Sequence, residues 1–119
     1  MSGYPEKTCA IDRLVRQPAL VTAVLEGRKS QQRRDGVYGY PGETFDLDGV
    51  TFRISALFRQ RLGDMSEADA RAEGFVDLRV YRDLIARMHP GMAWDGEHLG
   101  WVHEFERQPP LTREPDPDL

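Results

Sequence analysis

The first helical pattern of hydrophobic positions begins after Pro18 and ends at Gly27. Proline is well tolerated in the first turn of a helix, and glycine readily adopts the left-handed conformation that ends one. Four apolar residues, Leu20, Val21, Val24 and Leu25, are spaced so that they share one face of a helix. The pattern therefore predicts a helix over residues 18–26.

Alternating apolar and polar positions predict strands further along the chain. Residues 44–47 and 50–54 alternate on either side of an Asp-Gly pair, which is a strong signal for a two-residue hairpin turn. The second of these strands is expected to continue to Phe58. Residues 30–34 are expected to be extended, and residues 99–105 alternate as a final strand.

Two more helices are predicted between these strands. Ser66 and Asp69 have the spacing of a capping box, so a short helix is expected over residues 67–73, ending at Gly74. Asp77 caps a longer helix. The apolar face of that helix consists of Val80, Tyr81, Leu84, Ile85 and Met88.

The order of these elements is a helix, several strands including a hairpin, two helices and a strand. This order does not alternate strand with helix, so it predicts an α+β fold in which helices pack beside a small, mainly antiparallel sheet or barrel. A chain of 119 residues has the length of one domain. We expect an N-terminal extension over residues 1–15, the domain over residues 16–107, and a Pro-rich acidic tail over residues 108–119 that is disordered or lies along the surface.

Composition narrows the class of protein. No apolar run is long enough to cross a bilayer, the N-terminus lacks the apolar core of a signal peptide, and Cys9 is the only cysteine. These features predict a cytoplasmic protein without a membrane partner or an internal disulfide. One cysteine and three scattered histidines do not have the spacing of a metal site, so neither a metal nor another cofactor is expected.

A basic segment is the strongest candidate for chemistry. Four of the seven residues from Arg28 to Arg34 are cationic, whereas the net charge of the chain is -4. A cluster that opposes the overall charge indicates an anionic ligand or partner. The mild overall acidity argues against tight, non-specific binding to long duplex nucleic acid. It leaves open a short single strand or a single nucleotide as the ligand.

The segment offers several ligand-binding side chains. Arg28, Arg33 and Arg34 can grip phosphate in a two-pronged manner, or they form a solvated charge run. Strand alternation places Arg33 and Arg34 on opposite faces, so we expect one of them to face a site. Gln32 carries a donor and an acceptor that suit a base edge, although a plain surface glutamine fits the sequence equally well.

Four aromatic residues are candidates for stacking on a base, namely Tyr38, Tyr40, Trp94 and Trp101. Trp101 lies among alternating apolar residues, so we expect it in the core. Trp94 lies in a Gly-rich loop and is the better candidate. Ser30 is a candidate nucleophile only if a base lies beside it.

Five segments, taken in order, resemble the ASCH domain family. They are Leu25–Ser30 followed by Arg34, Gly42–Phe45, Asp64–Gly74, His89–Gly91 and Val102–Glu106. The similarity runs from about Ala19 to Glu106, roughly three quarters of the chain. It implies a PUA-like β-barrel with flanking helices, and a cleft that binds RNA or nucleotide-like ligands. It also favours Arg34 as the arginine that faces the site.

The motif layout is closest to that of small bacterial members that deacylate 4-acetylcytidine. That group uses a lysine, a threonine three residues later and a glutamate from a helix end. The resemblance places the lysine at Lys29 and the glutamate at Glu73, but Gln32 stands at the threonine position. Glutamine has no nucleophilic hydroxyl. Either the chemistry is lost, or Ser30 or a water molecule replaces the threonine, or the ligand differs.

Lys29 and Glu73 therefore have two interpretations. They are a catalytic pair that activates a hydroxyl or water, or they are a structural ion pair that joins a loop to a helix. Three functions follow from these patterns and the resemblance. The first is binding of RNA or a nucleoside or nucleotide in a basic cleft. The second is an amidohydrolase for 4-acetylcytidine or a related base, and the third is a ribonuclease.

Overall fold

The computed structural model describes residues 3–88 and 96–109. Three helices, four strands and two short 3-10 turns are formed in this part of the chain. In chain order they are η1 Ile11–Arg13, α1 Pro18–Leu25, β1 Gln31–Arg34, β2 Thr44–Leu47, β3 Val50–Arg61, η2 Leu62–Asp64, α2 Glu67–Ala72, α3 Leu78–Met88 and β4 Leu99–Arg107. The predicted helices and strands are confirmed to within a few residues.

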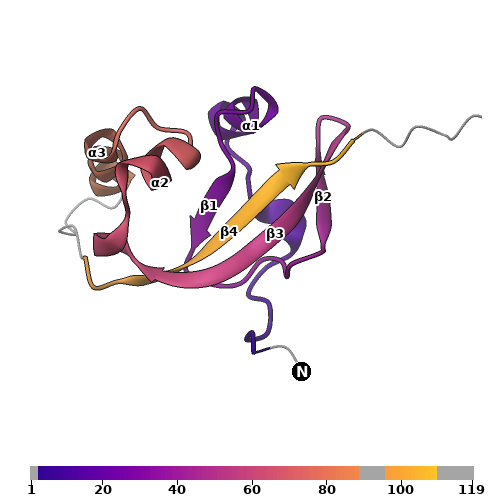
Figure 1. The fold of residues 1–119 in the computed structure, drawn as a ribbon, viewed down its shortest axis with the longest axis horizontal. Coiled ribbons are helices and arrows are strands. Elements are labelled where there is room, and N and C mark those ends of the chain that lie inside the picture. The colour runs from indigo at the N-terminus through magenta and orange to yellow at the C-terminus, as the bar shows by residue number, and fades with distance from the viewer. Residues whose placement is uncertain (1–2, 89–95, 110–119) are drawn as a thin grey trace, which may run out of the picture.

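The four strands form one curled sheet in the order β1-β4-β3-β2, and every neighbouring pair is antiparallel. The predicted hairpin is present, with Leu47 paired to Val50. Its turn residues Asp48 and Gly49 have φ angles of 49° and 82°, which the Asp-Gly pair tolerates well. The predicted α+β class is confirmed, and the curled sheet forms an open half-barrel with helices beside it (Figure 1).

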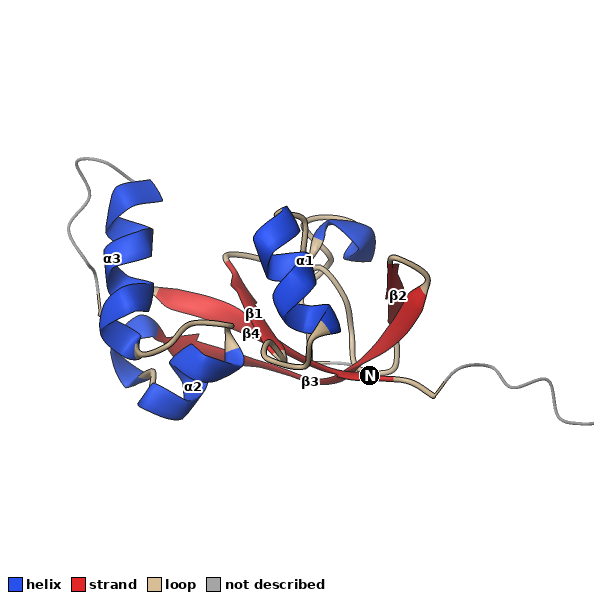
Figure 2. Ribbon diagram, turned by 90° about the horizontal axis from the view of Figure 1, so that it is seen from above, coloured by secondary structure: helices blue, strands red, loops and turns tan. Residues whose placement is uncertain are grey.

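The helices lie at different places on this sheet. Figures 1 and 2 show α1 above the middle of the sheet, α2 and α3 together at one end, and the β2–β3 hairpin at the other end. We call these the helix end and the hairpin end. The strand β1 is an outer strand of the sheet and lies between α1 and the helix end.

The hairpin end holds the main apolar core. Its fully or largely buried residues are Leu14, Val15, Val24, Phe45, Leu47, Phe52, Ile54 and Phe105. The rest of the predicted α1 stripe is partly buried against this cluster. Leu14 and Val15 follow η1 directly, and Leu14 is 0 % exposed. The residues just before α1 are therefore part of the core.

The helix end is held by local capping and a smaller core. The predicted capping box is confirmed, since Ser66 Oγ accepts from the Asp69 N–H at 3.0 Å and Asp69 Oδ2 accepts from the Ser66 N–H at 3.0 Å. Tyr81 is buried on the inner face of α3. Val80 and Met88, which were predicted on that face, are 39 % and 49 % exposed. Val80 lies at the margin of the apolar stripe, and Met88 is the last residue of α3.

Some predicted features lie outside the described residues. These are Trp94, the His89–Gly91 stop after α3, and most of the predicted C-terminal tail. Trp101 is described and was expected in the core, but it is only half-buried. Its ring packs against Tyr4 and under the guanidinium of Arg59, because this part of β4 faces the N-terminal segment. In the described parts of the chain, every helix is too short or too polar to span a membrane.

Candidate functional site

The end of α1 places Lys29 inside the molecule. Gly27 has a φ of 81° and ends the helix, and the N–H groups of Arg28 and Lys29 both donate to Ala23 O. The next N–H, that of Ser30, donates to Ala72 O at the end of α2 at 2.7 Å. This backbone contact fixes the loop against α2. As a result, Lys29 lies beside the C-terminal end of that helix.

Lys29 is buried and fully bonded. Its side chain is 0 % exposed, and Nζ donates to Gln31 O at 2.7 Å, to Glu73 O at 2.8 Å and to Glu73 Oε1 at 3.4 Å. Burial lowers the pKa of Lys29, because the charged ammonium is removed from water, and the carboxylate of Glu73 opposes part of this effect. The partial negative charge of the helix end also favours the ammonium.

Glu73 lies between two cations. Its side chain is 2 % exposed, Oε2 accepts from Arg33 Nη1 at 2.8 Å, and Oε1 faces Lys29. Gly74 follows with a φ of 102°, and a Cβ at this position would lie 3.4 Å from the Lys29 Cβ. The glycine thus permits both the turn after α2 and the close approach of the lysine. Lys29, Arg33 and Glu73 are called the buried triad below.

A layer of polar side chains holds Arg33 in place. Gln31 accepts from Arg33 Nη1 at 2.8 Å and donates to Glu104 at 2.7 Å, and Gln60 accepts from Arg33 Nη2. Asp69 Oδ1 lies 3.8 Å from Arg33 Nη2. Burial raises the pKa of Asp69, but hydrogen bonds from Ser66 and the charge of Arg33 outweigh it, so the pKa lies below its ordinary value. The carboxylate of Asp69 therefore supplies negative charge beside Arg33.

A pocket of about 940 Å³ lies against the triad. Its walls come from the segment before and within the first turn of α1, from β1 and from α3, and all three members of the triad line it. Gln32 lines it too and is 8 % exposed. Its Nε2 donates to Arg33 O at 3.1 Å, whereas its Oε1 is buried without a hydrogen-bond partner. A concave pocket with a few buried polar groups is typical of a small-molecule site.

Arg34 and Gln32 lie on the opposite face of β1 from Arg33. They pair in register with Trp101 and His103 of β4. The guanidinium of Arg34 donates to Leu14 O at 2.6 Å and lies 5.2 Å from the ring centre of Tyr38. Both arginines line the pocket, which passes the outer edge of β1. Only one of them was expected to face a site, but both can line this pocket because an edge strand exposes both of its faces to a pocket at its side.

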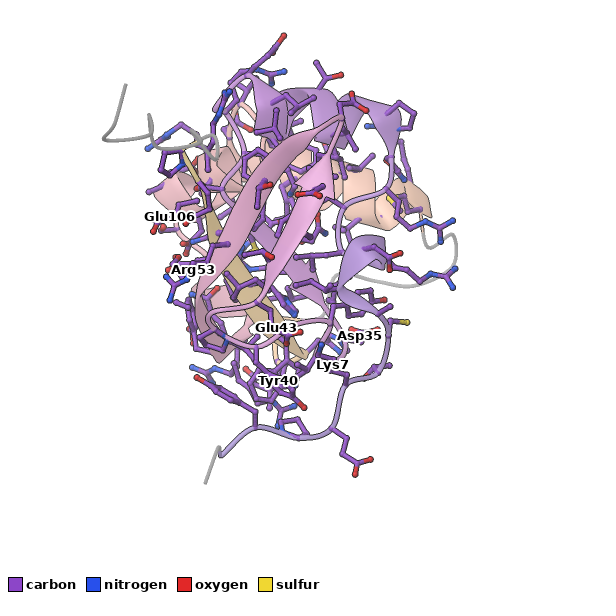
Figure 3. The ribbon with its side chains drawn as sticks, turned by 90° about the vertical axis from the view of Figure 1, so that its right-hand side faces the viewer. Lys7, Asp35, Tyr40, Glu43, Arg53 and Glu106 are labelled. Atoms are coloured by element: carbon purple, nitrogen blue, oxygen red, sulfur yellow. The ribbon has the colours of Figure 1, made fainter. Side chains whose placement is uncertain are left out.

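Three of the candidate site residues lie outside the pocket lining. Arg28 is exposed and pairs with Glu26 at 2.7 Å, and Ser30 is exposed, with only its backbone engaged by α2 and β4. Tyr40 donates its hydroxyl to Pro5 O at 2.8 Å. Figure 3 shows it beside Lys7 and Glu43 at the N-terminal segment. The contacts that hold these residues outside the pocket lining were not evident from the sequence pattern.

The structure also adds residues that the sequence analysis did not single out for the site. Arg16 lines the pocket just before α1, and Tyr81 lines it from α3. Burial raises the pKa of the Tyr81 hydroxyl, and the negative charge of Glu73 raises it further. The only sequence signal was the apolar stripe that contained Tyr81. Within residues 3–88 and 96–109, no three His, Cys, Asp or Glu side chains are grouped as metal ligands.

The fold is similar to that of two solved structures. An ASCH domain from Lactobacillus crispatus JV V101 aligns over 86% of this chain and 77% of its own, with 16% identity and a TM-score of 0.57. A protein of Enterococcus faecalis V583 assigned to DUF984 aligns over 75% of this chain and 66% of its own, with 18% identity and a TM-score of 0.50. No protein-family model and no curated protein sequence matches the chain. The resemblance to ASCH domains is therefore confirmed at the level of the fold.

Proposed function

We propose that this chain, which has the fold of an ASCH domain, binds a nucleobase-bearing ligand in the pocket beside β1. The ligand is a nucleoside, a nucleotide or one nucleotide of an RNA strand. The observation that carries the proposal is the buried Oε1 of Gln32, which lacks a hydrogen-bond partner at the wall of the pocket.

The orientation of the Gln32 amide supports this reading. Exchanging its oxygen and nitrogen would place the oxygen against the Arg33 carbonyl, to which Nε2 now donates at 3.1 Å. The free atom is therefore the acceptor. A buried acceptor without a partner costs about 1–3 kcal/mol, and an N–H of a ligand would remove this cost. Nucleobases present N–H donors along their Watson–Crick edges, so a base is a suitable partner.

The hydrogen bonding of the Lys29 ammonium group favours ligand binding over nucleophilic catalysis. Its ammonium is engaged by two backbone carbonyls and one carboxylate. The hydroxyl of Ser30 lies outside the pocket lining, so it is poorly placed to replace the missing threonine. The triad then forms a rigid charged floor that shapes the pocket, and Gln32 provides the contact that selects the ligand.

The test is a binding assay with Gln32→Leu, which keeps the size of the side chain and removes the acceptor. We expect the wild-type protein to bind at least one of the common nucleosides, nucleotides or a short single-stranded RNA in isothermal titration calorimetry. Gln32→Leu should bind that ligand about ten-fold or more weakly. Ser30→Ala is the matched control, because its side chain lies outside the pocket. Equal affinities for the wild type and Gln32→Leu would refute the role of Gln32.

A second candidate function is hydrolysis of 4-acetylcytidine or a related acylated base. The lowered pKa of Lys29 and its contact with Glu73 favour it, because such a pair can activate a water molecule. Release of acetate would be compared for the wild type, Lys29→Ala and Gln32→Thr, with circular dichroism to check folding. Turnover by the wild type that is lost in a folded Lys29→Ala would support an enzyme. Turnover only in Gln32→Thr would indicate that the natural protein binds its ligand without hydrolysing it, and that the fold can support hydrolysis once a threonine is supplied.

A further inference from the structure

The charged residues of the pocket fall into two groups. Four cations line it, Arg16, Lys29, Arg33 and Arg34, together with the carboxylates of Asp35 and Glu73. The pocket lining among the described residues therefore has an excess of two positive charges, although the whole chain has a net charge of -4. An excess of this sign within an acidic protein favours an anionic ligand.

The charges of the inner group are paired, although Arg33 Nε is buried without a hydrogen-bond partner. Lys29 and Arg33 share the carboxylate of Glu73, and Asp69 lies 3.8 Å from the same arginine. Two buried cations thus face the buried carboxylate of Glu73 and the partly exposed carboxylate of Asp69. A ligand phosphate would compete with these carboxylates for the two cations, so the inner group is a poor phosphate site.

The outer group is not satisfied. Arg34 is half-buried, and its described hydrogen bonds go to the neutral carbonyl groups of Arg13 and Leu14. Arg16 is exposed, and within residues 3–88 and 96–109 its side chain makes no ion pair or hydrogen bond. The carboxylate of Asp35 already contacts His98 at 2.7 Å. Asp69, which is not part of the pocket lining, balances the inner group, and Arg16 and Arg34 against the carboxylate of Asp35 leave the outer group with one positive charge in excess.

The two arginines belong to the same wall. Arg34 from β1 is fastened to the Leu14 carbonyl, and Arg16 follows Leu14 by two residues. Stacking on Tyr38 further holds the guanidinium of Arg34 in place. A preorganised guanidinium and a second, unpaired one in the lining of the same pocket are suited to binding phosphate oxygens. The unpartnered Gln32 Oε1, which lies on the same face of β1 as Arg34, independently indicates a ligand in this pocket.

We propose that Arg16 and Arg34 form a phosphate subsite, so that the ligand is a phosphorylated nucleoside rather than a free nucleoside. This inference rests on the proposed function, in which Gln32 contacts the base. Arg16 and Arg34 hold the phosphate at the outer wall, and the base extends along β1 toward Gln32. The phosphate belongs either to a free nucleotide or to an RNA backbone, and the experiment separates these two sources.

The experiment measures the affinities of the four ribonucleosides, their 5′-monophosphates and a single-stranded hexaribonucleotide that contains all four bases. We expect at least one monophosphate to bind ten-fold or more tightly than its nucleoside. Arg16→Gln should remove most of that difference and leave the affinity for the nucleoside unchanged. Arg28→Gln, which removes the same charge from an exposed position outside the pocket, should leave both affinities unchanged. A preference for the hexanucleotide that weakens with added salt would assign the phosphate to RNA.

Several results would overturn the phosphate subsite. If a nucleoside and its monophosphate bind equally well, the subsite is refuted while the base-binding function stands. If the monophosphate is preferred but Arg16→Gln and Arg28→Gln reduce binding equally, the effect is general electrostatics and the assignment fails. If no nucleoside, nucleotide or hexanucleotide binds, the proposed function and the subsite fail together. Thermal unfolding of Arg16→Gln should match the wild type, because in the described part of the chain this side chain has no hydrogen bond or ion pair to lose.

Discussion

The hairpin end and the helix end of the same sheet are built in different ways. At the hairpin end, Phe45, Phe52 and Phe105 pack with ring centres 5.4–6.1 Å apart, within a fully apolar cluster. At the helix end, the interior beside β1 holds the buried triad, in which Glu73 contacts both Lys29 and Arg33. The hairpin end is stabilised by burial of apolar area, whereas the helix end combines a smaller apolar core with a few directed charge contacts.

This difference is consistent with the ligand site proposed at the helix end. Apolar packing tolerates exchange of similar side chains, because it depends on volume more than on direction. A buried ionic cluster tolerates little exchange, because each charge depends on its partner, and replacing the whole cluster with apolar residues is often neutral for stability. The triad is thus a poor choice for stability alone. Its position in the lining of the pocket supports the proposal that it serves ligand binding.

The largest expected effect comes from Glu73→Gln, which leaves the shape of the side chain and removes its charge. Lys29 and Arg33 would remain buried without this carboxylate, so we expect a loss of about 3–5 kcal/mol in the free energy of unfolding. Urea unfolding measures it. Glu106→Gln, at an exposed position of β4, is the control and should change stability by less than about 0.5 kcal/mol. Similar losses in both variants would contradict the contrast between the two ends.

A smaller effect is expected from Phe105→Leu at the hairpin end. This exchange keeps an apolar side chain within the three-ring cluster, so the loss should be below about 1.5 kcal/mol in the same urea experiment. Phe105→Ala sharpens the comparison, because the cavity that it leaves should cost about 3–5 kcal/mol. If Phe105→Leu lowers the free energy of unfolding as much as Glu73→Gln, then packing at the hairpin end also depends on the exact shape of its side chains.

The next prediction concerns His103 of β4, which pairs with Gln32 of β1. Its effect on the free energy of unfolding is the smallest of the three at neutral pH and grows in acid. Its Nε2 accepts from the Tyr38 N–H at 3.0 Å, so its Nδ1 carries the proton toward Gln32 O at 3.2 Å. Burial lowers the pKa of His103, and the charge of Arg34 also lowers it. The unfolded chain, with a pKa of about 6.5, therefore binds this proton more readily. Stability should be full above about pH 6.5 and should fall as the pH drops toward the lower pKa of the folded state.

The measurement compares urea midpoints at about pH 7.5 and about pH 5 for the wild type and His103→Gln. Glutamine can still accept and donate, but it does not titrate. Titration of the other groups occurs in both proteins and cancels in the difference. A smaller acid-induced loss in His103→Gln is the expected result. Parallel losses in the two proteins would show that His103 does not contribute.

Local signals in the sequence were sufficient for most elements of the fold. The Asp-Gly turn, the Ser66–Asp69 capping box and the glycine after α1 act through neighbouring residues, so their outcomes do not depend on distant contacts. The family resemblance also paired Lys29 with Glu73 in one candidate site. The structure brings these two side chains to 3.4 Å across 44 positions of sequence separation.

The sequence by itself determined the helices, the hairpin, the charge of residues 28–34 and the apolar stripes, because periodicity and turn chemistry are local. Only the tertiary structure decided which charges are satisfied. Strand alternation predicts that Arg33 and Arg34 point to opposite faces of β1. Their partners depend on tertiary packing, because Glu73 at the end of α2 contacts Arg33, and carbonyl groups of the segment before α1 contact Arg34. The position of Arg16 in the pocket lining likewise depends on the packing of distant segments, which no local pattern encodes.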